Sequence, residues 1–246
     1  MRRWLLVSSA LVLATVARAQ SARPLTIGER AEYDVSYGVV KAGHATVAVT
    51  SVDHIRDREA YGIRFTMNAG VNLLLYHYSI HDTMRSWVDT ATFRSLRFYQ
   101  DQHDGGRTRV KRYEIFPDRQ VFIDEKNEEA PSVAEPLDEL AFLFFARRQN
   151  LDVGSTRNFD RYFKPATNPV TLIVLNKDTI DVAGKRWPAV VVRPIIKTSS
   201  LFAEGAEARV WMSDDPAHII LQLNVKVKVG SITMKLRSYD DGAHGP

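Results

Sequence analysis

The clearest pattern in this chain is Leu221-Gln222-Leu223-Asn224-Val225-Lys226-Val227-Lys228-Val229, in which apolar and polar residues alternate. Such alternation places one set of side chains on a buried face of a β-strand and the other set on a wet face. Gly230 and Ser231 follow, and the alternation resumes from Ile232 to Arg237. Two alternating runs separated by a two-residue turn predict a β-hairpin.

The same alternation recurs through most of the chain. It is found in Tyr33–Tyr37, Tyr61–Met67, Tyr76–Val88, Val110–Phe116, Val121–Ile123 and Thr171–Leu175. By this criterion the chain has roughly a dozen candidate strands. One-sided strands are typical of antiparallel sheets, and a sheet of this size has to curl, close or split. The sequence therefore predicts a mainly β fold, a large curled antiparallel sheet or a partly open barrel.

One segment, Leu137–Asn150, breaks this rhythm and predicts a central helix over about 137–150. Pro136 fits the first turn of a helix, with two acids near the expected start and two arginines near the expected end. The middle of the segment is apolar almost all round, so it is either buried on several sides or poised over a hydrophobic surface. The candidate ligand contacts are its apolar side chains, Leu140, Phe142, Leu143, Phe144 and Phe145.

The N-terminus has the pattern of a secretory signal peptide. Arg2 and Arg3 precede an apolar run from Trp4 to Val16, and Ala17-Arg18-Ala19 places small residues where a signal peptidase cleaves. We expect residues 1–19 to be removed after Ala19, which gives an exported, periplasmic protein that starts at Gln20.

A permanent membrane anchor is the alternative for this segment. Its apolar run is shorter than the roughly 20 residues that a spanning helix needs, so we expect no membrane-spanning segment. The chain contains no cysteine, which excludes disulfides, thiolate metal sites and lipid attachment at a cysteine after the cleavage site. Residues 20–246 should form a single soluble domain with two β halves, about 27–124 and 157–239, joined by the helical segment.

Removal of the leader changes the charge of the protein. The full chain has 33 basic and 29 acidic residues and a formal net charge of +4. Three of the basic residues and none of the acids lie in residues 1–19, which leaves 30 basic and 29 acidic residues and a net charge of +1. We expect no clustered basic face on the mature chain, and therefore no nucleic-acid partner.

His77 and His81 are the most plausible metal ligands by spacing. On a helix they would share one face, but the zinc-protease pattern needs a glutamate directly after the first histidine, and Tyr78 stands there. On a strand, residues four apart are separated by about 13 Å, too far for two ligands of one zinc ion. We expect no metal and no cofactor.

No catalytic constellation emerges. A serine nucleophile usually lies in a G-x-S-x-G turn, which is absent, so Ser79 or Ser86 near His81 and Asp82 is weak evidence for a triad. The acidic residues permit a pair of catalytic carboxylates, but no spacing favours one pair. Asp214-Asp215-Pro216 is more typical of a turn at a strand end than of a calcium site. The sequence therefore predicts a protein that is not an enzyme.

Several segments together resemble the exported domain of unknown function 3108 family. Its opening strand, G-E-x-x-x-Y-x-V-x-Y/W-G, is similar to Gly28–Gly38, and its A-x-V/I-W-x-S-D-D run is similar to Ala208–Asp215. Val227–Ile232 resembles the closing hairpin, and Asp82, Ser86 and Asp89 fit a D-x-x-x-S-x-x-D strand. The resemblance spans about residues 27–239.

The resemblance implies a β-rich exported protein similar in outline to the lipoprotein-carrier architecture, with no catalytic residues to transfer. Family members often carry a serine and a tyrosine in the central helix, where this chain has only apolar residues. The leading functional hypothesis is a periplasmic binding or chaperone-like protein that shelters a hydrophobic ligand, such as an acyl chain or lipid, within the curled sheet, with the helix as its plug or lid. The alternative is an envelope scaffold or partner-binding protein without a small-molecule ligand.

Overall fold

The computed structural model describes residues 25–73, 76–197, 207–226 and 230–243, and the predicted signal peptide lies outside them. These residues form one sheet of 14 strands, an α-helix and two short 3₁₀ helices. The elements are β1 (Arg30–Tyr37), β2 (Val40–Ile55), β3 (Arg58–Leu73), β4 (Tyr76–Asp89), β5 (Ser95–Asp104), β6 (Arg107–Phe116), η1 (Pro117–Arg119), β7 (Val121–Ile123), β8 (Glu129–Pro131), α1 (Glu139–Ala146), β9 (Thr156–Phe159), η2 (Pro165–Thr167), β10 (Val170–Val182), β11 (Lys185–Ile195), β12 (Ala208–Ser213), β13 (Ile220–Lys226) and β14 (Ser231–Asp240).

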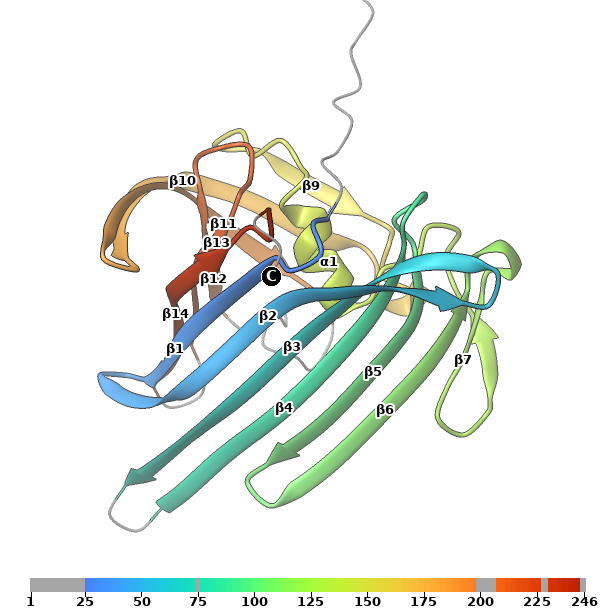
Figure 1. Ribbon diagram of the computed structural model, residues 1–246, viewed down its shortest axis with the longest axis horizontal. Helices are drawn as coiled ribbons and strands as arrows, with labels where there is room; N and C mark the ends of the chain where they lie inside the picture. Colours follow the sequence, from blue (N-terminus) through green and yellow to red (C-terminus); the bar gives the residue numbers. More distant parts are fainter. Residues whose placement is uncertain (1–24, 74–75, 198–206, 227–229, 244–246) are drawn as a thin grey trace, which may run out of the picture.

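The strand order is β8-β7-β6-β5-β4-β3-β2-β1-β14-β13-β12-β11-β10-β9, and every pair is antiparallel. Almost all pairs join strands that follow one another in the chain, the usual outcome of short connections. The exception is β1 with β14, whose register runs from Arg30↔Asp240 to Tyr37↔Ile232. This pair joins the two halves of the sheet, as Figure 1 shows where the blue and red strands lie side by side.

The sheet curls without closing, and α1 lies between its two halves (Figure 1). Within the described residues the sheet ends at β8 on one side and at β9 on the other, and both are short strands. Short edge strands limit the backbone that is open to further pairing. The predicted curled antiparallel sheet with one central helix is confirmed.

The helix is shorter than the predicted 137–150. It begins at Glu139. The backbone of Leu137 is not helical, because it is hydrogen-bonded to the segment after the helix, at Arg161 (2.6 Å) and Phe163 (3.0 Å). Regular helix ends at Ala146, and the chain continues in turns. Within the described residues, no helix combines the length and apolarity that crossing a bilayer requires.

Two other boundaries differ from those predicted. The first β half extends past residue 124, because β8 at Glu129–Pro131 pairs with β7. The last hairpin is confirmed, but Ser231 is the first residue of β14, paired with Lys226, and is not part of a two-residue turn. Residues 227–229 of the predicted strand lie outside the described residues.

Candidate functional site

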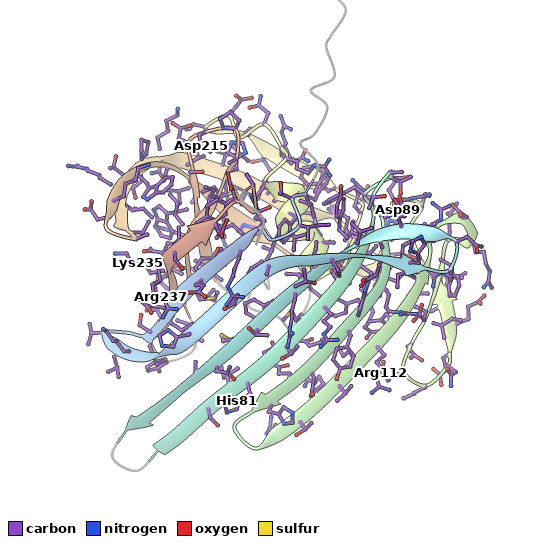
Figure 2. All side chains as sticks on the ribbon, in the orientation of Figure 1. His81, Asp89, Arg112, Asp215, Lys235 and Arg237 are labelled. Atoms are coloured by element: carbon purple, nitrogen blue, oxygen red, sulfur yellow. The ribbon has the colours of Figure 1, made fainter. Side chains whose placement is uncertain are left out.

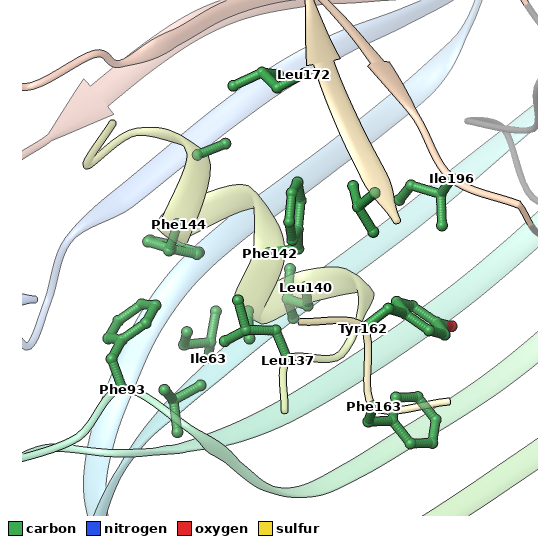
Figure 3. Close-up of a cluster of buried hydrophobic side chains, with 14 of the residues drawn as sticks. Ile63, Phe93, Leu137, Leu140, Phe142, Phe144, Tyr162, Phe163, Leu172 and Ile196 are labelled. Atoms are coloured by element: carbon green, nitrogen blue, oxygen red, sulfur yellow. The ribbon is translucent and has the colours of Figure 1, made fainter. Parts of the chain in front are cut away.

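The five apolar helix residues predicted to contact a ligand pack into the main hydrophobic cluster. Leu140, Phe142 and Phe144 are buried, and Leu143 and Phe145 are half-buried. The cluster combines α1 with side chains of both sheet halves, among them Ile63 and Leu172, and Figure 3 shows these surrounding the helix. The structure thus brings the predicted residues together, and the side chains around them are those of the protein core.

A small cavity adjoins the last turns of the helix. It is lined by Leu143, Phe144 and Arg147 together with side chains of β1 and of the β13 end of the sheet, and its volume is about 20 Å³. A cavity of that size holds about one water molecule. An acyl chain does not fit at this cavity in the conformation described.

Asp138 fixes the helix to the sheet. Its Oδ1 accepts hydrogen bonds from the backbone N–H groups of Leu140 and Ala141, both at 2.9 Å, so it is the N-cap of α1. Its Oδ2 accepts hydrogen bonds from Ser86 on β4 (2.6 Å) and Ser95 on β5 (2.7 Å). The carboxylate is fully buried, and burial raises its pKa to about 6 against these hydrogen bonds. We call Asp138, Ser86 and Ser95 the Asp138 clamp.

The strand alternation excludes the serine triad considered from the sequence. On β4, Asp82 and Ser86 are buried on the inner face, whereas His81 is exposed on the outer face and lies 2.8 Å from Asn68 Oδ1. Ser86 is bound to Asp138 in the clamp.

The metal and calcium interpretations also find no support in the geometry. In the part of the chain that the structure describes, no three histidine, aspartate or glutamate side chains form a group that could hold a metal ion. Asp215 caps a turn instead, because its Oδ1 accepts hydrogen bonds from the N–H groups of Ala217 (2.9 Å) and His218 (3.3 Å). The turn interpretation of this segment is therefore confirmed.

A second polar group lies on the inner face of the sheet. Asp82 is 5% exposed and accepts hydrogen bonds from Gln100 Nε2 at 3.0 and 3.3 Å. Burial raises its pKa to about 6, and the Gln100 hydrogen bond and the positive charge of Lys111 oppose that rise. In the same region, Tyr162 donates a hydrogen bond to Glu139 Oε1 at 2.6 Å. A buried carboxyl group with a raised pKa is a candidate functional residue, so Asp82 is one.

Asp82→Asn is expected to stabilise the fold at neutral pH. The folded-state pKa is raised from 3.8 to about 6, so the stability contribution of Asp82 is present at low pH and is lost between about pH 4 and pH 6. The neutral amide avoids that loss, which amounts to as much as about 3 kcal/mol above pH 6. Urea unfolding of both proteins over this pH range measures the effect.

Asp89 on the same strand provides a control of opposite sign. Hydrogen bonds from Arg58 and from the turn that starts at Asp89 lower its pKa despite its burial. Asp89→Asn should therefore destabilise the fold at neutral pH, and the difference should shrink on acidification. An Asp82→Asn variant that is less stable than the parent protein at neutral pH would show that the Asp82 charge is stabilising.

The outer face of the sheet carries a hollow of about 410 Å³ over β4, β5 and β6. Its lining side chains on this face are Arg85, Trp87, Arg97, Tyr99, Arg112 and Glu114. In Figure 2 the side chain of Arg112 lies over this part of the sheet. The volume falls in the range of small-molecule sites, about 300–1,000 Å³.

The hollow was not predicted, and it corrects the expectation that the mature chain has no clustered basic face. A sequence signal did exist, since the Arg107–Arg112 segment of β6 contains four basic residues in six. The arginines of β4 and β5 are far from it in the sequence, and only strand pairing brings them together. The near-neutral net charge therefore conceals a local positive excess.

A family model described as a protein of unknown function (DUF3108) matches residues 32–237. The chain belongs to this family. The predicted resemblance is thus confirmed, and the structure gives roles to the D-x-x-x-S-x-x-D residues of this DUF3108 member. Asp82 lies in the inner polar group, Ser86 in the Asp138 clamp, and Asp89 at the turn after β4, paired with Arg58 at 2.8 Å.

Among solved structures, this DUF3108 chain is similar to the crystal structure of a beta-barrel-like protein of domain of unknown function DUF1849 from Brucella abortus. The TM-score is 0.59 at 12% sequence identity, over 89% of this chain and 99% of the other. This likeness shows a shared fold and no more. No curated protein sequence matches the chain significantly.

Proposed function

We propose that this chain is an exported, non-catalytic binding protein of the cell envelope, which holds its ligand or partner on the outer face of β3–β6. The hollow over β4–β6 is the observation that carries the proposal. Its volume of about 410 Å³ suits a ligand or a protruding group of a partner. It combines guanidinium groups with a tryptophan and a tyrosine, and these residue types are enriched at the energetic centres of binding surfaces.

The side chains of the hollow are held in place by neighbouring strands. Trp87 donates a hydrogen bond from Nε1 to Asp53 Oδ2 on β2 at 2.8 Å, and it reaches that strand across Gly62, its partner on β3. Gly62 has no side chain, so the indole has room to cross. Arg97 lies over the Trp87 ring at 5.6 Å, and Arg112 lies over the Tyr99 ring at 5.7 Å. Such preorganisation lowers the entropy cost of binding.

Export is part of the proposal and is supported by the charged, apolar and small-residue regions of residues 1–19. The absence of cysteine from the sequence supports a mature protein without a lipid anchor at its N-terminus. An internal hydrophobic ligand is less well supported, because the aromatic rings of α1 pack against one another and against Phe159 at centroid distances of 5.1–6.0 Å.

Site-specific crosslinking in intact cells tests the proposal. A photoreactive amino acid replaces Tyr99 in the hollow, and in separate strains Thr179 or Phe145. Thr179 is exposed on the other sheet half, and Phe145 is one of the apolar helix residues. We expect an adduct at position 99 that mass spectrometry resolves into chain plus ligand or partner, and none at position 179. The recovered chain should begin at Gln20.

The three positions separate the alternatives. An adduct with a hydrophobic molecule at position 145 and none at position 99 would support internal carriage instead. Equal adducts at positions 99 and 179 would indicate only random contact and would contradict the proposal. A chain recovered with residues 1–19 intact would contradict export with cleavage.

A further inference from the structure

Four side chains on the outer face form a continuous row across β3, β4, β5 and β6. The register pairs Arg64 with Arg85, Arg85 with Tyr99, and Tyr99 with Arg112. The three arginines are exposed and Tyr99 is half-buried. They lie on the face of the sheet away from the core residues with which they alternate along each strand. We call these four residues the arginine row.

The row contains an unfavourable pair. Arg64 and Arg85 are directly opposite each other on adjacent strands, where like charges are destabilising. Among the described residues, no carboxylate pairs with Arg64, Arg85 or Arg112. An anion placed over the row would relieve this repulsion.

Two acids on β5 and β6 beside the row, Asp101 and Glu114, contact other side chains. Glu114 accepts hydrogen bonds from Arg97 and from Arg56, the latter at 2.7 Å. Asp101 lies on β5, two residues after Tyr99, and its Oδ1 is 3.1 Å from Nε2 of His103. Neither acid forms an ion pair with Arg64, Arg85 or Arg112, so these three guanidinium groups keep their positive charge on the outer face.

Two guanidinium groups of this face lie over aromatic rings. Arg112 lies over the Tyr99 ring at 5.7 Å from its centroid, and Arg97 similarly covers Trp87. A guanidinium group within about 6 Å of a ring centroid is attracted to the ring, and its N–H groups match the paired oxygens of a phosphate. Phosphate fits better than carboxylate, because it carries more charge and three acceptor oxygens for several arginines.

We propose that the arginine row binds a ligand that carries at least two phosphate groups, an inference that rests on the proposed binding function. Neighbouring strands are about 4.8 Å apart, so Arg85 and Arg112, two strands apart, are separated by about 10 Å. One phosphate lies between Arg64 and Arg85, and a second is bound at Arg112. The hollow of about 410 Å³ accommodates more than one such group.

The phosphate groups can belong to a soluble molecule or to lipid headgroups, and binding experiments on the mature chain distinguish these sources. Inorganic tripolyphosphate is the soluble probe, measured by calorimetry, with citrate as the carboxylate control. Vesicles of cardiolipin, a lipid with two phosphate groups per molecule, in phosphatidylcholine are the lipid probe, with phosphatidylcholine vesicles as control, measured by cosedimentation. Binding to tripolyphosphate that weakens with added salt and exceeds binding to citrate supports the proposal, as does binding to the anionic vesicles alone.

The double variant Arg85→Glu/Arg112→Glu is expected to lower the affinity for the bound probe at least tenfold, since two charged hydrogen-bonding groups are reversed. The control, Arg186→Glu/Arg209→Glu, makes the same charge change at two exposed arginines of β11 and β12 and should bind within about twofold of the parent chain. The single variant Arg85→Glu removes the Arg64–Arg85 repulsion, so its melting temperature should equal or exceed that of the parent chain.

Several outcomes would overturn this inference: equal affinity in the two double variants, citrate bound as tightly as tripolyphosphate, or no binding of any probe. If no probe binds while crosslinking at position 99 still captures a partner, the proposed function stands and only the phosphate assignment fails. If neither is observed, both fail.

Discussion

Replacing Asp138 with alanine is expected to lower the free energy of unfolding by about 4 kcal/mol near pH 5. The carboxyl group caps the helix through two backbone N–H groups and accepts hydrogen bonds from the hydroxyls of Ser86 and Ser95. Loss of an N-cap costs about 1 kcal/mol, and each buried polar group left without a partner costs about 1–3 kcal/mol. Urea unfolding followed by circular dichroism measures the change.

The pH dependence of this effect has a defined sign. Burial raises the folded-state pKa of Asp138 from 3.8 to about 6, so the stability that it provides is greatest at low pH and falls as the pH rises through about 6. The difference between parent and variant should therefore be smaller above pH 6 than near pH 5.

Asp124 provides the matched control for the Asp138 variant. Its Oδ1 also accepts two backbone hydrogen bonds, from Lys126 at 2.9 Å and Glu128 at 3.0 Å, but in an exposed turn. Asp124→Ala should cost much less than Asp138→Ala. Equal losses from the two variants would mean that the Asp138 clamp adds nothing to an ordinary turn.

Phe142→Ala is expected to destabilise the fold by about 3–5 kcal/mol, the usual cost of removing a buried phenylalanine. The Phe142 ring is 3% exposed, and its centroid lies 5.6 Å from that of Phe145 and 6.0 Å from that of Phe159. Thermal or urea unfolding measures the loss, and Phe145→Ala is the comparison because that ring is only half-buried.

This pair of variants also separates two interpretations of the apolar helix. Truncation of a core side chain destabilises the protein whether or not a ligand is present. If Phe142→Ala were as stable as the parent chain, the ring would not belong to the core, and the interpretation of Phe142 as a ligand contact would be strengthened.

Much of the fold could be predicted because it depends on local patterns. Alternation in stretches such as Tyr61–Met67 and Leu221–Lys226 identifies strands with one buried face, and short connections make consecutive strands pair. The central helix was identifiable because its apolar residues depart from the period of two. The first residue of the helix was not identifiable, because Leu137 is kept out of it by backbone hydrogen bonds to Arg161 and Phe163, which are distant in the sequence.

The candidate sites were predictable to a smaller extent. The aromatic residues of α1 were correctly located on one helix, but whether their rings face a ligand or the core depends on the two sheet halves that meet around them. Asp138 was identified only as a favourable charge near the helix start, because its serine partners come from two strands more than 40 residues earlier. The arginine row depends on strand register, because a shift of one residue in a strand would move its side chain in the row to the opposite face of the sheet.

The sequence by itself determined the alternation of the strands, the apolar helix, the family and the signal peptide pattern, because each depends on residues close together in the chain. The tertiary structure alone decided the pairing of β1 with β14, the burial of Asp138 and the row formed by Arg64, Arg85, Tyr99 and Arg112. These features join residues far apart in the sequence. Their proximity follows from strand register and from the packing of one helix between two halves of a sheet, which no short stretch of sequence specifies.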